Sequence, residues 1–368
     1  MHFPVRDTKG GVTKYAINNW SKINKKVFQF DFAAVNASAE FEDEISKTGA
    51  NFYYIGCTAE KSPQKFCNEL YNILSNGKYD IVHLHTSMWK STLAERVAKE
   101  AGIKRIIIHA HSTSIFGSSE EARRNNLDRH NKIVETITPD IATDYWACST
   151  AAAQFLYGNK IPQSIIRIMP NAIDITRYAY DSCMREIIRD EMKLKDNFVI
   201  GHVGRFAYPK NQEFLLGIVK KLVGIIPTIK LVLVGDGENR GKCESYVAEN
   251  GLQNHVVFTG YREDTENLLQ AFDVFTLPSL FEGVSIALIE AQAAGLTCLA
   301  SNRVYDDVNI TGNVKFLPLN VETWCGAIET SYKSRIRQRF DTLQQIREAG
   351  YDIQRQIKEV EKGYLGEL

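Results

Sequence analysis

The chain has 368 residues, more than the roughly 250–300 at which a single hydrophobic core usually stops growing, so two domains are expected. Its 44 lysine and arginine residues balance 44 aspartate and glutamate residues, which argues against a nucleic-acid partner. A hydrophobic fraction of 44% is ordinary for a globular protein. No stretch reaches the ~18–20 apolar residues of a membrane-spanning helix.

Positive charge gathers locally at two places in the first half of the chain. These clusters are Lys22, Lys25 and Lys26, and Arg123, Arg124, Arg129 and Lys132. They are either solvated surface or patches that meet anionic lipid or a phosphate-bearing acceptor. The first residues run into charges already at Arg6 and Asp7, unlike a signal peptide. We therefore expect a cytoplasmic protein, with peripheral contact to the cytoplasmic face of a membrane left open.

The seven cysteines are scattered, with no CxxC pair and no Cys/His cluster at metal-ligand spacing. Most lie in apolar strings, as Cys148 does after Trp146 and Ala147. This usage predicts buried free thiols of a reducing compartment. Neither a metal ion nor another cofactor is expected.

Short apolar runs alternate with longer amphipathic segments, which is typical of parallel α/β folds. After a short first strand at Met1–Val5, the strands predicted in the first half are Val27–Phe32, Phe52–Tyr54, Ile81–His85, Arg105–Ala110, Tyr145–Ala147 and Ile166–Met169. The helices predicted between them include Lys65–Ser75 and Thr92–Ala101. A first strand usually needs about five or six residues, which leaves open a sequence that starts inside that strand.

The alternation restarts after a break near residues 172–197. The predicted elements are strand Phe198–Val203, helix Gln212–Val223, strand Lys230–Val234, helix Gly241–Asn250, strand Val256–Thr259, helix Thr265–Ala271, strand Val274–Leu277, helix Ile286–Ala294 and strand Thr297–Ala300. We therefore expect doubly wound domains at 1–174 and 175–350, and a closing helical segment at 351–368. Such sheets bind ligands at the carboxyl ends of their strands, so two facing domains would share one cleft.

The densest chemical signal begins where the predicted strand ends at Leu277. Glu282 and Gly283 follow in a loop, and Ser285 is a good N-cap for the next helix. The start of a helix suits a diphosphate, and carboxylates accept hydrogen bonds from sugar hydroxyls. Glu290 lies about two helical turns further on, so the Glu282 and Glu290 carboxylates would border one binding pocket. The alternative is that Glu282 is a surface charge and Glu290 pairs with a neighbouring base.

A second signal follows the strand that ends at Val203. Gly204 and Arg205 come directly after it, and a proline-constrained turn leads to Lys210. Two cations beside a helix start would neutralise a diphosphate leaving group as its bond to the sugar breaks. Solvated surface charges are an equally weighted alternative.

Two weaker signals lie in the first half. The pair Gly10-Gly11 would let backbone amides face a phosphate or a sugar, although paired glycines are also common in plain turns. His109 and His111 end a strand, where a histidine could bind a sugar hydroxyl or handle a proton. We expect only one of the two to face the cleft.

The run Gly235-Asp236-Gly237 superficially suggests a dinucleotide fingerprint. It does not fit G-x-G-x-x-G, because the next glycine is Gly241. No acidic residue follows the next strand at Thr259-Gly260, where a ribose-binding carboxylate would lie. A nicotinamide enzyme is therefore disfavoured.

Taken together, these motifs resemble the retaining GT-B glycosyltransferases of the family 4, "group 1" type. The matching segments, in the family's order, are Pro170–Asp174, Val203–Phe206 with Lys210–Asn211, Val234–Gly237, Pro278–Gly283 and Glu290–Gly295. The resemblance implies two facing Rossmann-like domains with a cleft between them. Within the family, Arg105–Ser114 and Tyr145–Ser149 most resemble bacterial capsular and exopolysaccharide transferases.

The resemblance also implies roles for individual residues. Arg205 and Lys210 would hold the donor diphosphate, and Gly11 would approach the phosphates. Glu282 would contact the transferred sugar, and Glu290 would bind the ribose. The backbone of Gly283, Val284 and Ser285 would cradle sugar and phosphate, and His111 would lie near the reacting sugar.

The implied activity is transfer of a hexose or N-acetylhexosamine from a nucleotide diphosphate sugar, favouring UDP, to a polysaccharide or lipid-linked acceptor. Configuration would be retained, usually without a metal. Two departures from the family pattern, Ala172 in place of a glycine and Thr297 in place of a proline, are conservative. The alternatives are a nucleotide-sugar epimerase or hydrolase of the same shape, and a catalytically silent nucleotide-sugar binder.

Overall fold

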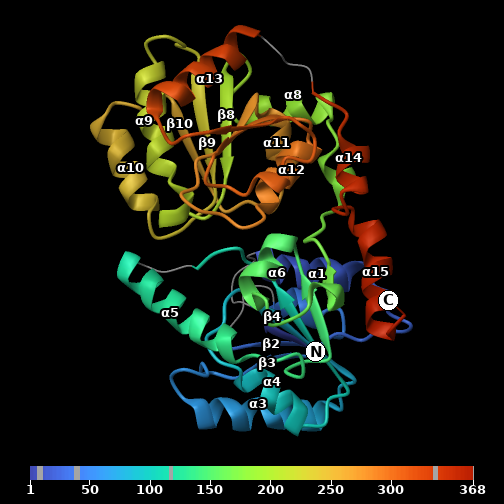
Figure 1. Cartoon of the computed structure of the whole chain (residues 1–368). Helices are drawn as coiled ribbons and strands as arrows, with labels where there is room; N and C mark the ends of the chain where they lie inside the picture. Colours follow the sequence, from blue (N-terminus) through green and yellow to red (C-terminus); the bar gives the residue numbers. More distant parts are fainter. Residues whose placement is uncertain (6–10, 37–41, 116–118, 335–338, 368) are drawn as a thin grey trace. The chain divides into compact units, whose positions relative to one another are not determined.

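The computed structural model describes residues 1–5, 11–36, 42–115, 119–334 and 339–367. The chain divides into two compact units, unit 1 (Met1–Ile173 with Ile353–Leu368) and unit 2 (Asp174–Asp352). Each unit contains a parallel sheet flanked by helices (Figure 1). The α/β class predicted from the alternating pattern is confirmed.

The sheet of unit 1 has the strand order β3-β2-β1-β4-β5-β6-β7 among the described residues. Its strands are β1 (His2–Val5), β2 (Phe32–Ala34), β3 (Phe52–Tyr54), β4 (Ile81–Thr86), β5 (Arg105–Ala110), β6 (Asp144–Ala147) and β7 (Ile166–Ile168). Its helices are α1 (Gly11–Lys22), α2 (Glu42–Ser46), α3 (Pro63–Gly77), α4 (Leu93–Glu100), α5 (Glu120–Thr136), α6 (Thr150–Tyr157) and α15 (Ile353–Leu365).

The core of unit 1 joins α1 and α15 to one face of the sheet. Trp20 of α1 and Val360 of α15 belong to one buried cluster with Phe32 of β2 and Ile107 of β5. Helices α3 and α4 lie against each other on the opposite face (Figure 1). Burial on both faces explains why β5 reads as the apolar run Ile106–Ile108.

The sheet of unit 2 has the order β10-β9-β8-β11-β12-β13 among the described residues. Its strands are β8 (Phe198–Val203), β9 (Ile229–Val234), β10 (Val256–Gly260), β11 (Val274–Leu277), β12 (Thr297–Ser301) and β13 (Val314–Leu317). Its helices are α7 (Ile175–Tyr178), α8 (Ser182–Glu191), α9 (Gln212–Leu222), α10 (Arg240–Glu249), α11 (Thr265–Ala271), α12 (Ile286–Ala293), α13 (Val321–Ser334) and α14 (Leu343–Glu348). Short 3-10 turns occur at Gln163–Ile165, Tyr208–Lys210 and Asp306–Val308.

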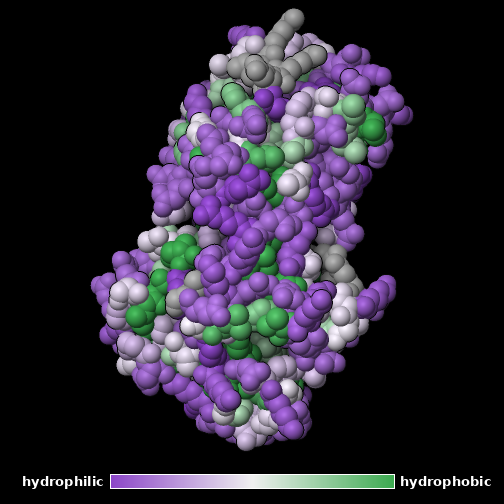
Figure 2. Space-filling view, turned by 90° about the vertical axis from the view of Figure 1, so that its right-hand side faces the viewer, coloured by the Kyte–Doolittle hydropathy of each residue, from purple (hydrophilic) through white to green (hydrophobic). Residues whose placement is uncertain are grey.

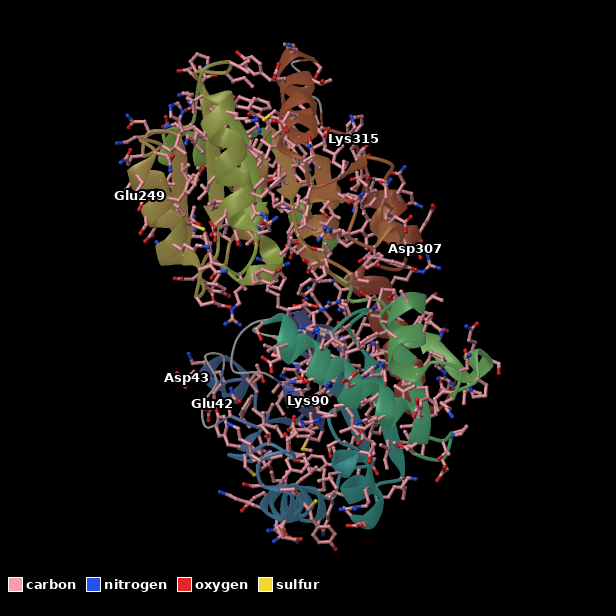
Figure 3. All side chains as sticks on the ribbon, turned by 60° about the vertical axis from the view of Figure 1, so that its left-hand side comes forward. Glu42, Asp43, Lys90, Glu249, Asp307 and Lys315 are labelled. Atoms are coloured by element: carbon pink, nitrogen blue, oxygen red, sulfur yellow. The ribbon has the colours of Figure 1, made fainter. Side chains whose placement is uncertain are left out.

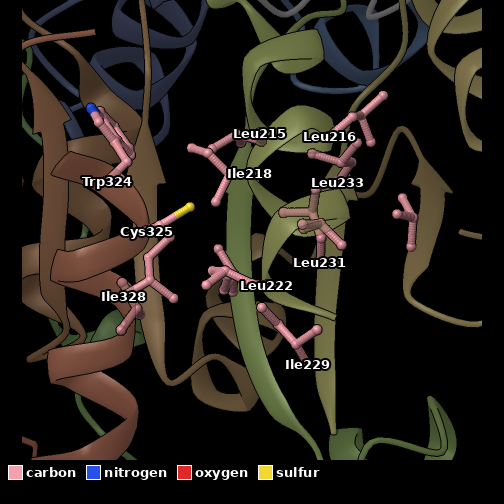
Figure 4. Packing of buried hydrophobic residues seen from close by; sticks show 14 of the residues in the cluster. Leu215, Leu216, Ile218, Leu222, Ile229, Leu231, Leu233, Trp324, Cys325 and Ile328 are labelled. Carbon is pink, nitrogen blue, oxygen red and sulfur yellow. The ribbon is translucent and has the colours of Figure 1, made fainter. Parts of the chain in front are cut away.

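One large apolar cluster in unit 2 lies between β9, α9 and α13. Leu215 and Leu222 of α9 face Leu231 of β9 on one side and Trp324 and Ile328 of α13 on the other (Figure 4). At about 1.5–3 kcal/mol for each large apolar side chain removed from water, this packing makes a rigid base for the strand ends.

The strand predicted at Val27–Phe32 is wrong, because the segment begins with a turn and β2 starts only at Phe32. The carbonyl oxygen of Asn24 accepts hydrogen bonds from the backbone N–H groups of Val27 and Phe28, and the Val27 side chain is exposed. These local bonds compete with strand pairing. The pattern also did not predict α8 and α13, and it gave no bounds for α5 among the helical segments expected between the first strands.

All seven cysteines are free, as predicted, but only Cys148, Cys243, Cys298 and Cys325 are buried. Cys183 is exposed, and Cys57 and Cys67 are half-buried. The prediction of a uniformly buried set is therefore wrong for these three, which lie on helix faces and loops at the surface.

The surface carries mostly charged and polar side chains. Figure 3 labels six of them, including Lys90 of unit 1 and Glu249, Asp307 and Lys315 of unit 2, which all point outward. Figure 2 shows a face on which hydrophilic residues predominate and hydrophobic residues form small separate groups. Within the described parts of the chain, none of the helices combines the length and apolar character needed to cross a membrane.

Candidate active site

The strand order of unit 2 has a switch point between β8 and β11. The chain winds outward from β8 through β9 to β10, then returns to place β11 on the other side of β8. In doubly wound sheets, ligands bind at the carboxyl ends of the strands on either side of such a point. Lys210 follows β8 and Glu282 follows β11, so the fold brings together two residues 72 positions apart.

Two hydrogen bonds join the two loops at the switch point. The backbone N–H of Leu280 donates to the carbonyl oxygen of Pro209 at 2.8 Å. The side-chain amide of Asn211 donates to the carbonyl oxygen of Pro278 at 3.1 Å. Asn211 has a φ of 55°, a left-handed conformation that asparagine tolerates better than most residues. These bonds hold Lys210 opposite Glu282.

Lys210 and Glu282 form an ion pair. The Lys210 Nζ lies 2.9 Å from Oε1 and 2.8 Å from Oε2 of Glu282. The hydroxyl of Ser279 donates to the same Oε2 at 3.0 Å. The Lys210 and Glu282 side chains are 20% and 15% exposed, so neither is a freely solvated surface charge.

The loop after Glu282 leads into α12 through buried Gly283, half-buried Val284 and buried Ser285. Ser285 holds the N-cap position, as predicted, but its side chain makes no capping hydrogen bond. Its hydroxyl is buried and has no hydrogen-bond partner among the described residues. A buried polar atom left unpaired costs about 1–3 kcal/mol, so this hydroxyl suits a ligand beside the first turn of α12.

Glu290 lies on α12 with only 4% of its surface exposed. The hydroxyl of Tyr178 donates to its Oε1 at 2.8 Å. Burial, and after it the nearby Glu290 carboxylate, raise the pKa of the Tyr178 phenol. The Glu290 carboxylate thus has the Tyr178 hydroxyl as one of its hydrogen-bond partners.

Arg205 and the neighbouring glycine loop complete the carboxyl end of β8. The Arg205 guanidinium is 67% exposed and lies 3.1 Å from Oε2 of Glu238, so Arg205 stays near the surface. A Cβ on Gly235 would lie 2.3 Å from the carbonyl oxygen of Gly204, and one on Gly237 would lie 2.5 Å from that of Phe206. The Gly235–Gly237 loop thus packs backbone against backbone, consistent with the rejection of a nicotinamide site.

The two other predicted site residues belong to unit 1. Gly11 begins α1, whereas Gly10 falls outside the described residues. His111 follows β5, with Nε2 2.9 Å from Nδ1 of His85. His109 is fully buried, and His111 retains 9% exposure. Lys210 and Glu282 are thus the predicted site residues that contact each other directly, while His111 and Gly11 lie in the other unit.

The sequence argument missed three histidines that lie beside His109 and His111. His2 of β1 and His83 and His85 of β4 are buried in the same part of unit 1. Burial, and after it the neighbouring histidines, hold the pKa values of His83 and His85 well below the usual range. The available signal was a His-x-His pair at the end of each of two successive strands, because alternate residues of a strand share a face.

Known proteins resemble this chain over most of its length. Residues 9–177 match the family model "Glycosyltransferase Family 4", and residues 197–333 match "Glycosyl transferases group 1". The putative glycosyltransferase EpsF of Bacillus subtilis (strain 168) is 30% identical over 356 residues, which cover 95% of this chain and 91% of EpsF.

Two further proteins extend the comparison. The UDP-Gal:alpha-D-GlcNAc-diphosphoundecaprenol alpha-1,3-galactosyltransferase of Escherichia coli is 31% identical over a region that covers 63% of this chain and 60% of the length of that enzyme. The crystal structure of Anabaena HepE in complex with UDP-glucose has a TM-score of 0.74 at 19% identity, over 97% of this chain and 98% of that one. The protein described here belongs to the family 4, group 1 glycosyltransferases and has their GT-B fold.

Proposed function

We propose that this glycosyltransferase takes a hexose or N-acetylhexosamine from a UDP-sugar and transfers it, with retention of configuration, to a polysaccharide or lipid-linked oligosaccharide. One observation carries the proposal. At the switch point of unit 2, Glu282 pairs with Lys210 and lies just before Ser285, whose buried hydroxyl at the start of α12 has no partner among the described residues.

The diphosphate of the donor would be held by positive charge. Its oxygens would compete with Glu282 for the Lys210 ammonium, since phosphate oxygens are strong acceptors for a charged donor. Arg205, 67% exposed, can turn from Glu238 toward the same group. As the bond to the sugar breaks, these cations would stabilise the negative charge that develops on the leaving phosphate.

Release from Lys210 would leave the Glu282 carboxylate available to the transferred sugar. Its oxygens would accept hydrogen bonds from sugar hydroxyls while the Ser279 hydroxyl holds it in place. The backbone of Gly283, Val284 and Ser285 would support sugar and phosphate at the start of α12.

The remaining assignments concern the nucleoside and the reacting sugar. Glu290 would bind the ribose hydroxyls, with the Tyr178 hydroxyl holding the carboxylate in position. Gly11 would approach the phosphates through its backbone, and His111 would contact the transferred sugar.

The choice of UDP and of the acceptor is supported by the proteins compared above. HepE was crystallised with UDP-glucose, and the Escherichia coli relative is named for UDP-Gal and a diphosphoundecaprenol-linked acceptor. A lipid-linked acceptor would bring the protein to the cytoplasmic face of a membrane.

A thermal-shift screen against UDP, GDP, ADP and their sugars tests the donor. A ligand at 100 times its Kd adds about 2.7 kcal/mol of stability, so a binding nucleotide is readily seen. We expect stabilisation by the UDP series and its loss in Lys210→Ala. Stabilisation by another base alone would overturn the choice of UDP, and no stabilisation by any nucleotide would overturn the donor site.

Donor turnover with and without acceptor separates the alternatives. A transferase releases UDP fast only when an acceptor lipid or oligosaccharide is present, and the anomeric configuration of its product is read by NMR. Equal release without an acceptor would favour a hydrolase, and conversion of the sugar without UDP release would favour an epimerase. Tight UDP binding without any turnover over a wide acceptor panel would favour a silent binder.

A further inference from the structure

Five histidines and one tyrosine form a connected cluster in the core of unit 1. They lie on three adjacent strands and on the closing helix: His2 on β1, His83 and His85 on β4, His109 and His111 at the end of β5, and Tyr364 on α15. All six side chains are 0–9% exposed. Tyr15 of α1 lies edge-on to four of the histidine rings.

Strand register explains why these rings meet. His2 is directly opposite His83 in the β1–β4 pair, and His85 is directly opposite His109 in the β4–β5 pair. His83 and His85 are two residues apart and share one face of β4. That face is the one covered by α1 and α15, so the rings stack side by side in the core rather than at the surface.

Hydrogen bonds join the cluster into a single chain that uses every ring nitrogen once except Nδ1 of His111. The successive contacts are Met169 O to His109 Nε2 at 3.3 Å, His109 Nδ1 to His83 Nε2 at 3.1 Å, His83 Nδ1 to the Tyr364 hydroxyl at 2.8 Å, the Tyr364 hydroxyl to His2 Nε2 at 3.3 Å, His2 Nδ1 to His85 Nε2 at 2.9 Å, and His85 Nδ1 to His111 Nε2 at 2.9 Å.

The carbonyl oxygen of Met169 sets the direction of this chain, because a carbonyl can only accept. His109 must therefore carry its proton on Nε2, which makes its Nδ1 an acceptor for the Nε2–H of His83. His83 Nδ1 then accepts from the Tyr364 hydroxyl, whose oxygen accepts from the Nε2–H of His2.

The same rule carries through the last two rings. His2 Nδ1 accepts from the Nε2–H of His85, and His85 Nδ1 accepts from the Nε2–H of His111. All five rings are then neutral Nε2–H tautomers. The neutral state agrees with burial, which holds the pKa values of His2, His83, His85 and His109 well below the usual range.

The chain ends at Nδ1 of His111, which becomes an obligatory acceptor. This nitrogen is buried and has no hydrogen-bond partner among the described residues. The Asn171 side chain lies close enough to hydrogen-bond a protonated His111, which raises the His111 pKa against the larger effect of burial. With His111 neutral and protonated on Nε2, Oδ1 of Asn171 is buried and has no hydrogen-bond partner among the described residues. Two buried acceptors next to each other call for a ligand that brings O–H donors, as a sugar does.

We propose that His2, His83, His85, His109 and Tyr364 are positioning residues that fix His111 as the Nε2–H tautomer, so that its Nδ1 accepts a hydrogen bond from a hydroxyl of the bound sugar. The sugar as ligand rests on the proposed function. The tautomer does not, because it follows from the hydrogen-bond chain alone. His111 thereby orients a hydroxyl group and cannot donate a proton from Nδ1.

A metal ion is the competing explanation. His2, His83 and His85, and likewise His85, His109 and His111, have ring nitrogens within 4.8 Å of one another, close enough to hold one. A metal would need lone pairs from several of these nitrogens at once. In the hydrogen-bond chain, every ring nitrogen except Nδ1 of His111 already carries a proton or accepts a hydrogen bond. This arrangement favours the hydrogen-bond chain over a metal site.

Long-range proton–nitrogen NMR of the histidine-labelled protein at pH 7 tests the chain directly. We expect all five cluster histidines as Nε2–H tautomers. In Tyr364→Phe the ring remains in place, but the link between His83 and His2 is cut. His83 and His109 should keep their tautomer because Met169 still anchors them, whereas His2, His85 and His111 should become mixed.

Tyr157→Phe is the matched control. The Tyr157 hydroxyl is also buried in unit 1 and donates to the carbonyl oxygens of Ile108 and Trp146 at 2.8 Å, outside the chain. It should leave all five tautomers unchanged. Mixed tautomers in the unmodified protein, or equal effects of both substitutions on all five rings, would overturn the proposal.

Activity and metal binding provide independent readouts. If half of the His111 rings take the wrong tautomer, turnover by Tyr364→Phe should fall about twofold with the KM of the donor nearly unchanged. Fixed tautomers in a protein without transferase activity would support the hydrogen-bond chain and reject the proposed function. If one equivalent of Zn²⁺ binds and shifts the resonances of all the cluster histidines together, the cluster is a metal site and the hydrogen-bond chain is rejected.

Discussion

The two units present different chemistry at the same topological position. Each sheet has its switch point between its first and fourth strands, β1 and β4 in unit 1 and β8 and β11 in unit 2. In unit 2 this position holds charges, with Lys210 and Glu282 paired and 15–20% exposed. In unit 1 it holds neutral histidines, which are at most 9% exposed.

This difference shows two ways in which one fold prepares a site for a ligand. Charges near solvent can exchange an internal partner for an anionic ligand, because water screens them and the exchange replaces one ion pair with another. A buried neutral network cannot exchange charge. It controls which atoms donate and which accept, and so selects hydroxyl groups by hydrogen-bond direction.

The largest expected effect is a difference between the two units in how their stability depends on pH. Burial lowers the pKa values of the five cluster histidines in the folded protein, to about 3 for His111 and well below the ordinary value of 6.5 for the other four. The unfolded chain therefore binds more protons between these values, and the stability of unit 1 is full above pH 6.5 and falls as the pH drops below it. Each histidine contributes up to ~1.4 kcal/mol per pH unit.

Unit 2 is the internal control for this prediction. Among its described residues, His202 is the one buried histidine, and burial lowers the pKa of His202 to about 4. Brief pepsin digestion at pH 5 and 4, with the fragments identified by mass spectrometry, should cut unit 1 well before unit 2. Simultaneous cleavage of both units would contradict the neutral cluster.

The next effect concerns the charges of unit 2. Lys210→Ala should slow sugar transfer by ~10²–10³-fold, which is the cost of removing one preorganised electrostatic group. Lys221→Ala removes a lysine from an exposed pair with Glu322 on the same unit and should change the rate little. Similar rates for all three proteins in a steady-state transfer assay would reject Lys210 as a site residue.

A smaller effect is expected at the buried Glu290 carboxylate. Tyr178→Phe removes the hydroxyl that donates to it, and should destabilise the protein by about 1–3 kcal/mol. Glu290→Gln keeps an acceptor for that hydroxyl, so it should retain most of the stability while weakening binding of UDP. Urea unfolding and calorimetry measure the two quantities, and an equal loss of stability in both variants would argue against a ligand role for Glu290.

The smallest effect distinguishes two serines at the site. Ser285→Ala removes an unpaired hydroxyl, so the stability of the unliganded protein should be unchanged or higher, while the affinity for the donor falls by about 0.5–1.5 kcal/mol. Ser279→Ala removes a hydroxyl that donates to Glu282 and should lower stability without ligand. Thermal shifts with and without UDP decide between them. A drop in unliganded stability in Ser285→Ala would show that its hydroxyl has a structural partner.

Local pattern predicted the strands whose side chains are buried on both faces. Arg105–Ala110, Phe198–Val203 and Val274–Leu277 have the predicted bounds, because parallel strands in a covered sheet read as continuous apolar runs. The pattern gave no bounds for α5, since its residues are mostly polar and His130 is the one buried residue described in it. At Asn24, the backbone carbonyl and the side-chain oxygen both accept backbone N–H groups, and this turn replaces the start of the strand predicted at Val27–Phe32.

The sequence by itself determined the α/β class, the restart of the pattern after the first domain, and the motifs that mark the glycosyltransferase family, because these depend on short spacing along the chain. Only the tertiary structure decided that Lys210 pairs with Glu282, that the Ser285 hydroxyl is unpaired, and that five histidines join through Tyr364. The Lys210–Glu282 and Tyr364–His2 contacts link residues 72 and 362 positions apart. Strand order and register bring them together, and neither can be read from local periodicity.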